Sequence, residues 1–127
     1  MAKTVMIVDD SASLRQVVGI ALRGAGYEVI EGCDGKDALA KLTGQKVHLV
    51  ISDVNMPNMD GITFVKNLKQ MPAYKFTPVI MLTTESQEGK KQEGQAAGAK
   101  AWVVKPFQPE RVLAAKVLRT GVLPSPR

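Results

Sequence analysis

Short apolar runs alternate with longer stretches of mixed character along the 127-residue chain. The runs are rich in Val, Ile, Leu and Met, which predicts strands that are buried on both faces. In the stretches between them, apolar residues recur three and four positions apart, which predicts amphipathic helices. The predicted strands cover 5–8, 27–30, 47–51, 78–82 and 101–104. The first predicted helix begins at Ser11 or Ser13 and ends near Gly24, and the others cover 35–42, 62–70, 86–97 and 109–119.

Five strand–helix units predict an α/β fold: a doubly wound five-stranded parallel sheet with five helices. Right-handed crossovers place helices on both faces of such a sheet. The length is slightly below the usual ~150 residues per domain, which agrees with a single domain. We expect this domain to cover 1–120, and we expect 121–127, with Pro124 and Pro126, to form a tail or linker stub.

The first predicted helix indicates how the sheet is covered. Ser11 or Ser13 can cap it, because a serine side chain accepts a backbone N–H of the first turn. Its apolar positions follow the spacing of one helical face, which we expect to pack on the sheet. These positions are Leu14, Val17, Val18, Ala21 and Leu22.

Composition narrows the class of protein. Hydrophobic residues make up 45% of the chain and charged residues 23%, as in ordinary globular domains. No apolar run approaches the ~18 residues of a membrane span, and the amino-terminal residues lack the pattern of a secretory signal. The single cysteine, Cys33, excludes an internal disulfide and fits a reducing compartment. We therefore expect a cytoplasmic domain without membrane insertion.

The net charge of +5 does not by itself indicate a nucleic-acid partner. Basic residues are spread along the chain, only Lys90 and Lys91 are adjacent, and aromatic residues at 5% are too few for a base-stacking surface. We expect no nucleic-acid binding and prefer a protein partner, for which Lys90, Lys91 and Lys100 are either contacts or merely solvated. The sole histidine, His48, is interpreted as an edge or strand-start residue, because no second histidine or nearby cysteine could complete a metal site.

The residues directly after the predicted strands carry the candidate chemistry. The carboxyl ends of parallel strands share one edge of the sheet, where doubly wound domains bind ligands. We therefore expect these residues to converge, although they span almost a hundred positions. They are Asp9 and Asp10 after the first strand, Asp53 after the third, Thr83, Thr84 and Glu85 after the fourth, and Lys105 after the fifth.

Asp9, Asp10 and Asp53 would repel one another in one crevice and therefore need a cation. Oxygen ligands without cysteine or histidine indicate Mg²⁺ or another hard ion. The three carboxylates, one Mg²⁺ and Lys105 sum to zero charge, so a phosphoryl group on one carboxylate would make the site negative. This charge balance predicts a site that responds to phosphorylation. Taken alone, Asp9 and Asp10 could instead cap the first helix.

Together these features resemble the receiver domains of two-component response regulators, and most closely the single-domain chemotaxis regulators among them. The resemblance covers about residues 3–119 and implies the strand order 2-1-3-4-5. It rests on four motifs that occur in order, each at a strand end. These motifs are Asp9-Asp10, residues 52–61 (SDVNMPNMDG), Thr83-Thr84 and residues 103–107 (VVKPF).

The resemblance implies a role for each site residue. Asp53 would be the nucleophile that accepts a phosphoryl group from a histidine kinase. Asp10, Asp53 and the backbone carbonyl of Asn55 would coordinate Mg²⁺, and Asp9 would reach the ion mainly through water. The phosphoryl oxygens would be held by the Lys105 ammonium, the Thr83 hydroxyl and the backbone N–H groups of Asn55 and Thr84.

The resemblance also implies how the signal is switched and how long it lasts. Thr83 and Trp102 would form the switch, with Trp102 at the position where the family usually has the Tyr or Phe that turns inward on activation. Asn55 and Glu85 match the two positions that tune dephosphorylation. Both side chains are polar and leave room for water, which predicts a signal that lasts seconds to a few minutes.

The implied function is a monomeric phosphorylation switch. Its phosphoryl donor would be a histidine kinase of the chemotaxis type, and its target protein the flagellar motor switch. Activation would change the surface formed by the fourth helix, the fifth strand and the fifth helix. The alternatives are a receiver of another two-component pathway and a part of a longer regulator.

Two enzyme classes share parts of this pattern. Aspartyl-phosphate phosphatases need a second acid two residues after the nucleophile, where this chain has Asn55, which cannot exchange a proton at neutral pH. A flavodoxin-like FMN site needs a Ser- and Thr-rich phosphate loop after the first strand, where Asp9 and Asp10 would repel phosphate. We therefore expect a phosphoacceptor that catalyses its own phosphoryl transfer and dephosphorylation, and not an enzyme for other substrates.

Overall fold

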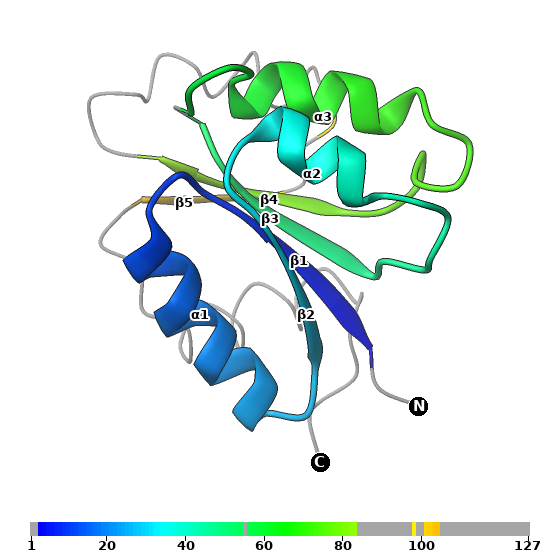
Figure 1. The fold of residues 1–127 in the computed structure, drawn as a ribbon. Coiled ribbons are helices and arrows are strands. Elements are labelled where there is room, and N and C mark those ends of the chain that lie inside the picture. Colours follow the sequence, from blue (N-terminus) through cyan, green and yellow to red (C-terminus); the bar gives the residue numbers. More distant parts are fainter. Residues whose placement is uncertain (1–2, 55, 84–97, 99–100, 105–127) are drawn as a thin grey trace.

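The computed structural model describes residues 3–54, 56–83, 98 and 101–104 (Figure 1). In chain order, the elements of this part are β1 (Thr4–Val8), α1 (Ala12–Gly24), β2 (Glu28–Gly32), α2 (Gly35–Lys41), β3 (Leu49–Asp53), α3 (Gly61–Lys69), β4 (Val79–Thr83) and β5 (Ala101–Val104). The helices predicted at 86–97 and 109–119, the domain boundary at 120 and the tail at 121–127 lie outside the described residues.

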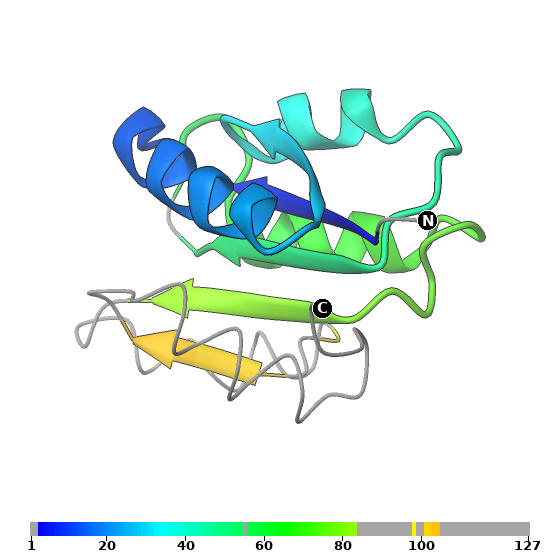
Figure 2. The same cartoon turned by 90° about the horizontal axis from the view of Figure 1, so that it is seen from below.

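The five strands form one parallel sheet with the order β2-β1-β3-β4-β5. β1 and β3 are interior strands, and Figure 2 shows β5 as an outermost strand, next to β4. Both the parallel α/β class and the strand order implied by the resemblance are confirmed. All the strands run in the same direction, so the carboxyl ends of β1, β3, β4 and β5 lie together at one end of the sheet. We call this end, where the strands terminate, the carboxyl edge, and the end where they begin the amino edge.

The described helices cover both faces of the sheet, α1 on one face and α2 with α3 on the other (Figure 1). Along β1, Val5 and Ile7 join the cluster of buried side chains around α1, whereas Met6 and Val8 join the cluster around α2 and α3. This alternation is the period of two that a strand imposes, and it leaves all four side chains fully buried. None of the described helices is long and apolar enough to cross a membrane.

Each described helix begins after a residue whose side chain caps it. Ser11 precedes α1, Asp34 precedes α2 and Asp60 precedes α3, and each side chain accepts the backbone N–H three residues later. Of the two serines predicted for the first helix, the structure thus selects Ser11. Because α1 and α3 start just after the carboxyl ends of β1 and β3, these caps also fix the loops that carry the candidate site.

β2 and β3 are displaced toward the carboxyl end of the strands predicted at 27–30 and 47–51. β2 begins one residue later and β3 two residues later than predicted, and both end two residues later, at Gly32 and Asp53. Gly32 and Ser52 both pair in register with Val8, the last residue of the central strand β1. Pairing with a buried neighbour therefore holds these non-apolar residues in the strand conformation. As a result, Asp53 is the last residue of a strand and not the first residue of a loop.

The buried face of α1 is narrower than predicted. Val18 and Leu22 are buried against the sheet, as expected, but Val17 is 57% exposed. Successive residues of a helix are about 100° apart, so Val17 lies at the margin of the arc that is centred on Val18. Ile20, which is 63% exposed, lies on the opposite side. The prediction that Val17 packs on the sheet is therefore wrong.

Val17 and Val18 are a matched pair for testing this packing. Val18→Ala should lower the free energy of unfolding by roughly 2 kcal/mol, because it removes buried methyl groups and leaves a cavity. Val17→Ala should change it by less than about 0.5 kcal/mol, because Val17 already faces water. Urea unfolding of both variants measures the difference. Equal losses would mean that α1 is rotated differently against the sheet.

Candidate functional site

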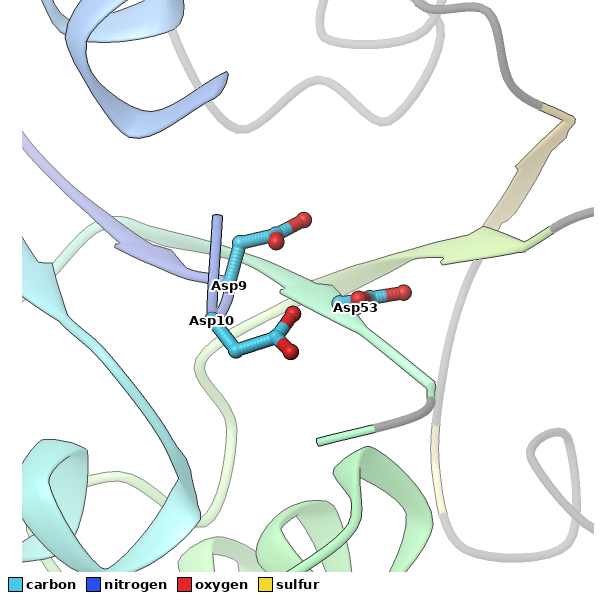
Figure 3. Close-up of side chains that lie close together, drawn as sticks. All are labelled: Asp9, Asp10 and Asp53. Carbon is cyan, nitrogen blue, oxygen red and sulfur yellow. The ribbon is translucent and has the colours of Figure 1, made fainter. Parts of the chain in front are cut away.

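Three aspartates meet at the carboxyl edge of the sheet (Figure 3). Asp9 and Asp10 follow β1, and Asp53 is the last residue of β3. The two strands are adjacent and parallel, with Val8 paired to Ser52, so both strand ends reach the same edge. One carboxylate oxygen from each aspartate lies within 4.8 Å of the other two. The structure thus brings together the three carboxylates that the sequence places at strand ends.

Asp9 is completely buried, and its hydrogen bonds fix the turn from β1 into α1. Its backbone N–H donates to the Gly32 carbonyl oxygen at 3.0 Å, and Arg15 Nη1 donates to the Asp9 carbonyl oxygen at 2.5 Å. The Asp9 carboxylate accepts the Ser11 N–H at 2.8 Å. The residue that caps α1 is therefore Ser11 and neither Asp9 nor Asp10, although Asp9 holds the capping residue in place.

Asp53 is only 5% exposed and is held by its neighbours in the chain. The Val54 N–H donates to Asp53 Oδ1 at 2.8 Å, which restricts the orientation of the carboxylate. The Ser52 hydroxyl donates to the Asp53 carbonyl oxygen at 3.0 Å. Asp10, in contrast, is exposed, so the cluster is reached from solvent on its side. Two shielded carboxylates and one accessible carboxylate can hold a ligand that enters from water.

The loop between Asp53 and α3 is tied to the start of α2. Asn58 has φ 66°, a left-handed conformation that asparagine tolerates, and its Nδ2 donates to Asp34 Oδ2 at 2.8 Å. The Asp37 N–H and the Asn58 amide, in that order of effect, hold the pKa of the Asp34 carboxyl below its usual value. The sequence gives no local signal for this contact, because the two partners are 24 positions apart.

Gly61 packs directly against the backbone of Asp53. A Cβ atom at this position would lie 1.9 Å from the Asp53 carbonyl oxygen, far inside van der Waals contact. The Gly61 N–H also donates to the Val54 carbonyl oxygen at 2.8 Å. Only glycine therefore allows α3 to begin so close to Asp53. Gly61 is the last residue of the sequence motif at 52–61, but the motif does not reveal this close approach.

The remaining predicted site residues are described in part or not at all. β4 ends at Thr83, which places the Thr83 backbone at the same edge as Asp53. Trp102 is the second residue of β5 and pairs with Met81. Asn55, Thr84, Glu85 and Lys105 lie outside the described residues. The chemical roles of all these residues, and of the three aspartates, stay predictions.

The donor set of the cluster fits a hard divalent cation. Mg²⁺ binds carboxylate oxygens at about 2.0–2.1 Å, so two oxygens on one ion lie no more than about 4.2 Å apart. The oxygens of Asp9, Asp10 and Asp53, within 4.8 Å of one another, need only small rotations or an intervening water to share an ion. Neither Cys33 nor His48 belongs to the cluster, so it contains no donor that favours a softer metal.

The structure thus combines a doubly wound parallel sheet with a cluster of aspartates at the ends of β1 and β3. The model of the response regulator receiver domain family matches residues 5–116, and the chain belongs to that family.

The relatives include proteins of about the length of this chain and longer ones. The solved structure of the chemotaxis response regulator CheY4 of Vibrio cholerae is 51% identical with a TM-score of 0.85, over 97% of this chain and 100% of that chain. The chemotaxis protein CheY of Bacillus subtilis is 40% identical over 116 residues, which are 91% of this chain and 95% of CheY. The phosphate regulon transcriptional regulatory protein PhoB of Pseudomonas aeruginosa is 36% identical over 95% of this chain but 54% of PhoB. The chain thus spans about half the length of that transcriptional regulator.

Gly61→Ala tests the close approach of α3 to Asp53. The added Cβ would overlap the Asp53 carbonyl, so the helix start or the strand end must move, and we expect the free energy of unfolding to fall by about 3 kcal/mol. Gly24→Ala is the matched control, because a Cβ at this last residue of α1 meets no atom within 4 Å. The control should be neutral or slightly stabilising. A Gly61→Ala protein as stable as wild type in urea would contradict the constraint.

Proposed function

We propose that this chain is a phosphorylation-activated signalling switch. A histidine kinase would transfer a phosphoryl group to Asp53 in the presence of Mg²⁺. The phosphorylated domain would then bind a target protein through the surface of its fourth helix, β5 and its fifth helix. One observation carries the proposal: Asp9, Asp10 and Asp53, two of them buried, meet in a chain that belongs to the receiver family.

In the proposed reaction, a carboxylate oxygen of Asp53 attacks the phosphorus of a phosphohistidine. The O–P bond forms as the N–P bond breaks, and the departing imidazole nitrogen keeps the electron pair and takes up a proton from solvent. Asp53 suits this role because the Val54 N–H restricts its orientation, and a nucleophile held in one geometry loses little entropy on the way to the transition state.

The proposed Mg²⁺ ligands are Asp10, Asp53 and the Asn55 carbonyl oxygen, with Asp9 acting mainly through water. When bound, Mg²⁺ supplies positive charge that offsets the repulsion among these groups and the phosphoryl oxygens. Asp9 and Asp53 would hold their places because both are nearly or fully buried. The groups proposed to bind the phosphoryl oxygens are the Lys105 ammonium, the Thr83 hydroxyl and the N–H groups of Asn55 and Thr84.

The proposed switch joins Thr83 and Trp102. Phosphorylation adds negative charge at the end of β3, and the neighbouring strand β4 ends at Thr83, whose hydroxyl we propose is drawn toward the phosphoryl group. Trp102 lies on β5, the next strand along the sheet, and is proposed to turn inward in response. The adjacency of β3, β4 and β5 supports this route from the phosphorylation site to the target surface.

Chemotaxis is the pathway that we propose. Support comes from the similarity to two chemotaxis proteins that this chain matches over nearly their whole length. The phosphoryl donor would then be a histidine kinase of the chemotaxis type, and the target the flagellar motor switch, reached by a cytoplasmic monomer. A receiver of another two-component pathway, or part of a longer regulator, is the second candidate, which the match to PhoB supports.

The site fits an enzyme that turns over other molecules less well than it fits a phosphoacceptor. Asn55 stands two residues after Asp53, where an aspartyl-phosphate phosphatase needs an acid that gives and takes a proton. Asp9 and Asp10 directly follow β1, where a flavodoxin-like FMN phosphate would meet their negative charge. We therefore propose that the domain catalyses only the phosphorylation of Asp53 and its reversal.

Asp53→Asn should abolish stable labelling by acetyl phosphate with Mg²⁺, because a neutral amide is not a nucleophile. Asp60→Asn is the matched control: it also removes one carboxylate, and asparagine caps a helix as well as aspartate does. The control should label like the wild type. The measured quantity is acid-stable, hydroxylamine-labile phosphate on the protein. Undiminished label on the Asp53→Asn protein would refute the assignment.

The proposed lifetime of the phosphoryl group depends on whether water can approach the phosphorus in line. Glu85→Leu should lengthen the lifetime roughly tenfold, because an apolar side chain shields the group and ~1.4 kcal/mol of added barrier is enough. Glu85→Gln keeps the size and polarity, so it should change the lifetime by less than about threefold. The decay of purified phosphoprotein gives both values. Wild-type phosphoprotein that persists for hours with Mg²⁺ would favour a slower pathway than chemotaxis.

A further inference from the structure

A hollow of about 530 Å³ lies at the amino edge of the sheet, the edge opposite the aspartates. β1 begins at Thr4 and β2 at Glu28, and His48 directly precedes β3. Because these strands are parallel, their first residues gather at one edge just as their last residues gather at the other. The residues that line the hollow include Lys3, Thr4, Glu28, Ile30, Lys46 and His48. Its volume is typical of small-molecule sites.

His48 is held in one orientation at this edge. Its Nδ1 accepts the Thr4 N–H at 3.0 Å, and its own backbone N–H donates to the Thr4 carbonyl oxygen at 2.8 Å. A ring nitrogen that accepts a hydrogen bond carries no proton, so the neutral ring carries its proton on Nε2. The half-buried His48 is therefore a fixed N–H donor in the wall of the hollow, and its place before β3 agrees with the strand-start interpretation.

Two lysines give the hollow a net positive charge. Within the part of the chain that the structure describes, neither Lys3 nor Lys46 forms an ion pair. Glu28 is the one acidic residue of the lining, so two ammonium groups and one carboxylate leave a charge of +1. Burial, followed by the positive charges of Lys3 and Lys46, lowers the pKa of His48. Both lysines thus act electrostatically on the imidazole.

The other lining residues supply surface and not charge. Gln45 uses its side-chain amide within its own loop, where Oε1 accepts the Thr43 N–H and Nε2 donates to the Lys41 carbonyl oxygen, both at 2.8 Å. Ile30 follows Glu28 by two residues on β2, so both lie on the same face of that strand. A ligand in the hollow would meet basic groups, the Glu28 carboxylate and one apolar wall.

We propose that this hollow binds a small molecule that carries a phosphate or carboxylate group. The anionic group would accept hydrogen bonds from His48 Nε2–H and from the ammonium groups of Lys3 and Lys46, and the rest of the ligand would contact Ile30. The aspartate cluster at the opposite edge would repel the same molecule. The two edges would therefore bind ligands of opposite charge.

Binding should strengthen as the pH falls from about 8 to about 5.5. The charged groups that share the hollow with His48 are Lys3, Lys46 and Glu28. His48 is the imidazole of the lining, the side chain whose ordinary pKa lies within this pH range. In the free protein the pKa of His48 lies below the usual value. The second proton of the ring would go to Nδ1 and displace the Thr4 N–H from it, and a bound anion favours this change, so by linkage the affinity rises as His48 is protonated.

Titration of the full chain with sulfate tests the site. Binding is measured by NMR, as the chemical shifts of the His48 ring in Mg²⁺-free buffer. Sulfate stays a dianion over the whole pH range, so its own titration does not contribute. Lys46→Gln should weaken binding about threefold to tenfold. Lys66→Gln makes the same change of charge on α3, outside the hollow, and should weaken it by less than about twofold. Glu28→Gln should tighten binding. His48→Gln, in which the Thr4 amide shift replaces the His48 ring as the readout, should remove the pH dependence.

Saturable shifts of the His48 ring that respond to Lys46→Gln but not to Lys66→Gln support the proposal. Equal weakening by both variants, or shifts that do not saturate, would overturn it, because the basic chain would then attract anions without a site. Parallel titrations with phosphate and citrate decide between the two ligand classes. Binding of polyglutamate without any response to sulfate, phosphate or citrate would also overturn the proposal, in favour of an acidic protein partner.

Discussion

Electrostatic repulsion among Asp9, Asp10 and Asp53 is the constraint on which the site depends, because their oxygens lie within 4.8 Å of one another. Two unit charges this far apart repel by roughly 3–4 kcal/mol at an effective dielectric constant of about 20. Asp9 and Asp53 are also almost completely removed from water, which adds a cost of desolvation. A positive charge in the cluster would offset both costs. The same crowding would favour the binding of a cation and a strong response to an added phosphoryl group.

The surrounding fold supplies the rigidity that keeps these like charges together. β1 and β3 pair in parallel register up to the residues before the aspartates, so the carboxylates leave neighbouring strands at the same level. Gly61 lets α3 begin against the backbone of Asp53, and the hydrogen bond from Asn58 to Asp34 ties the intervening loop to α2. The same parallel register gathers the basic residues of the hollow at the opposite edge. One sheet therefore separates an acidic edge from a basic edge.

Much of the fold could be predicted because buried apolar positions recur in the sequence with the period of a strand or a helix. The strand–helix alternation identified the parallel sheet, and the rule that strand ends share an edge identified the three aspartates as neighbours. The exposure of Val17 could not be predicted, because it depends on how α1 is rotated against the sheet. The close approach of Gly61 to Asp53 and the contact between Asn58 and Asp34 could not be predicted either, since tertiary contacts between residues distant in the sequence leave no local pattern.

The free energy of unfolding, measured against Mg²⁺ concentration at constant ionic strength, tests the cation site most directly. The wild type should gain stability along a saturable single-site curve, by about 1.4 kcal/mol when Mg²⁺ is at ten times its Kd. Asp10→Asn should be more stable than wild type without Mg²⁺, because one repulsive charge is gone, and it should lose most of the response to Mg²⁺. A wild type whose stability shows no saturable dependence on Mg²⁺ would contradict a cation site at these aspartates.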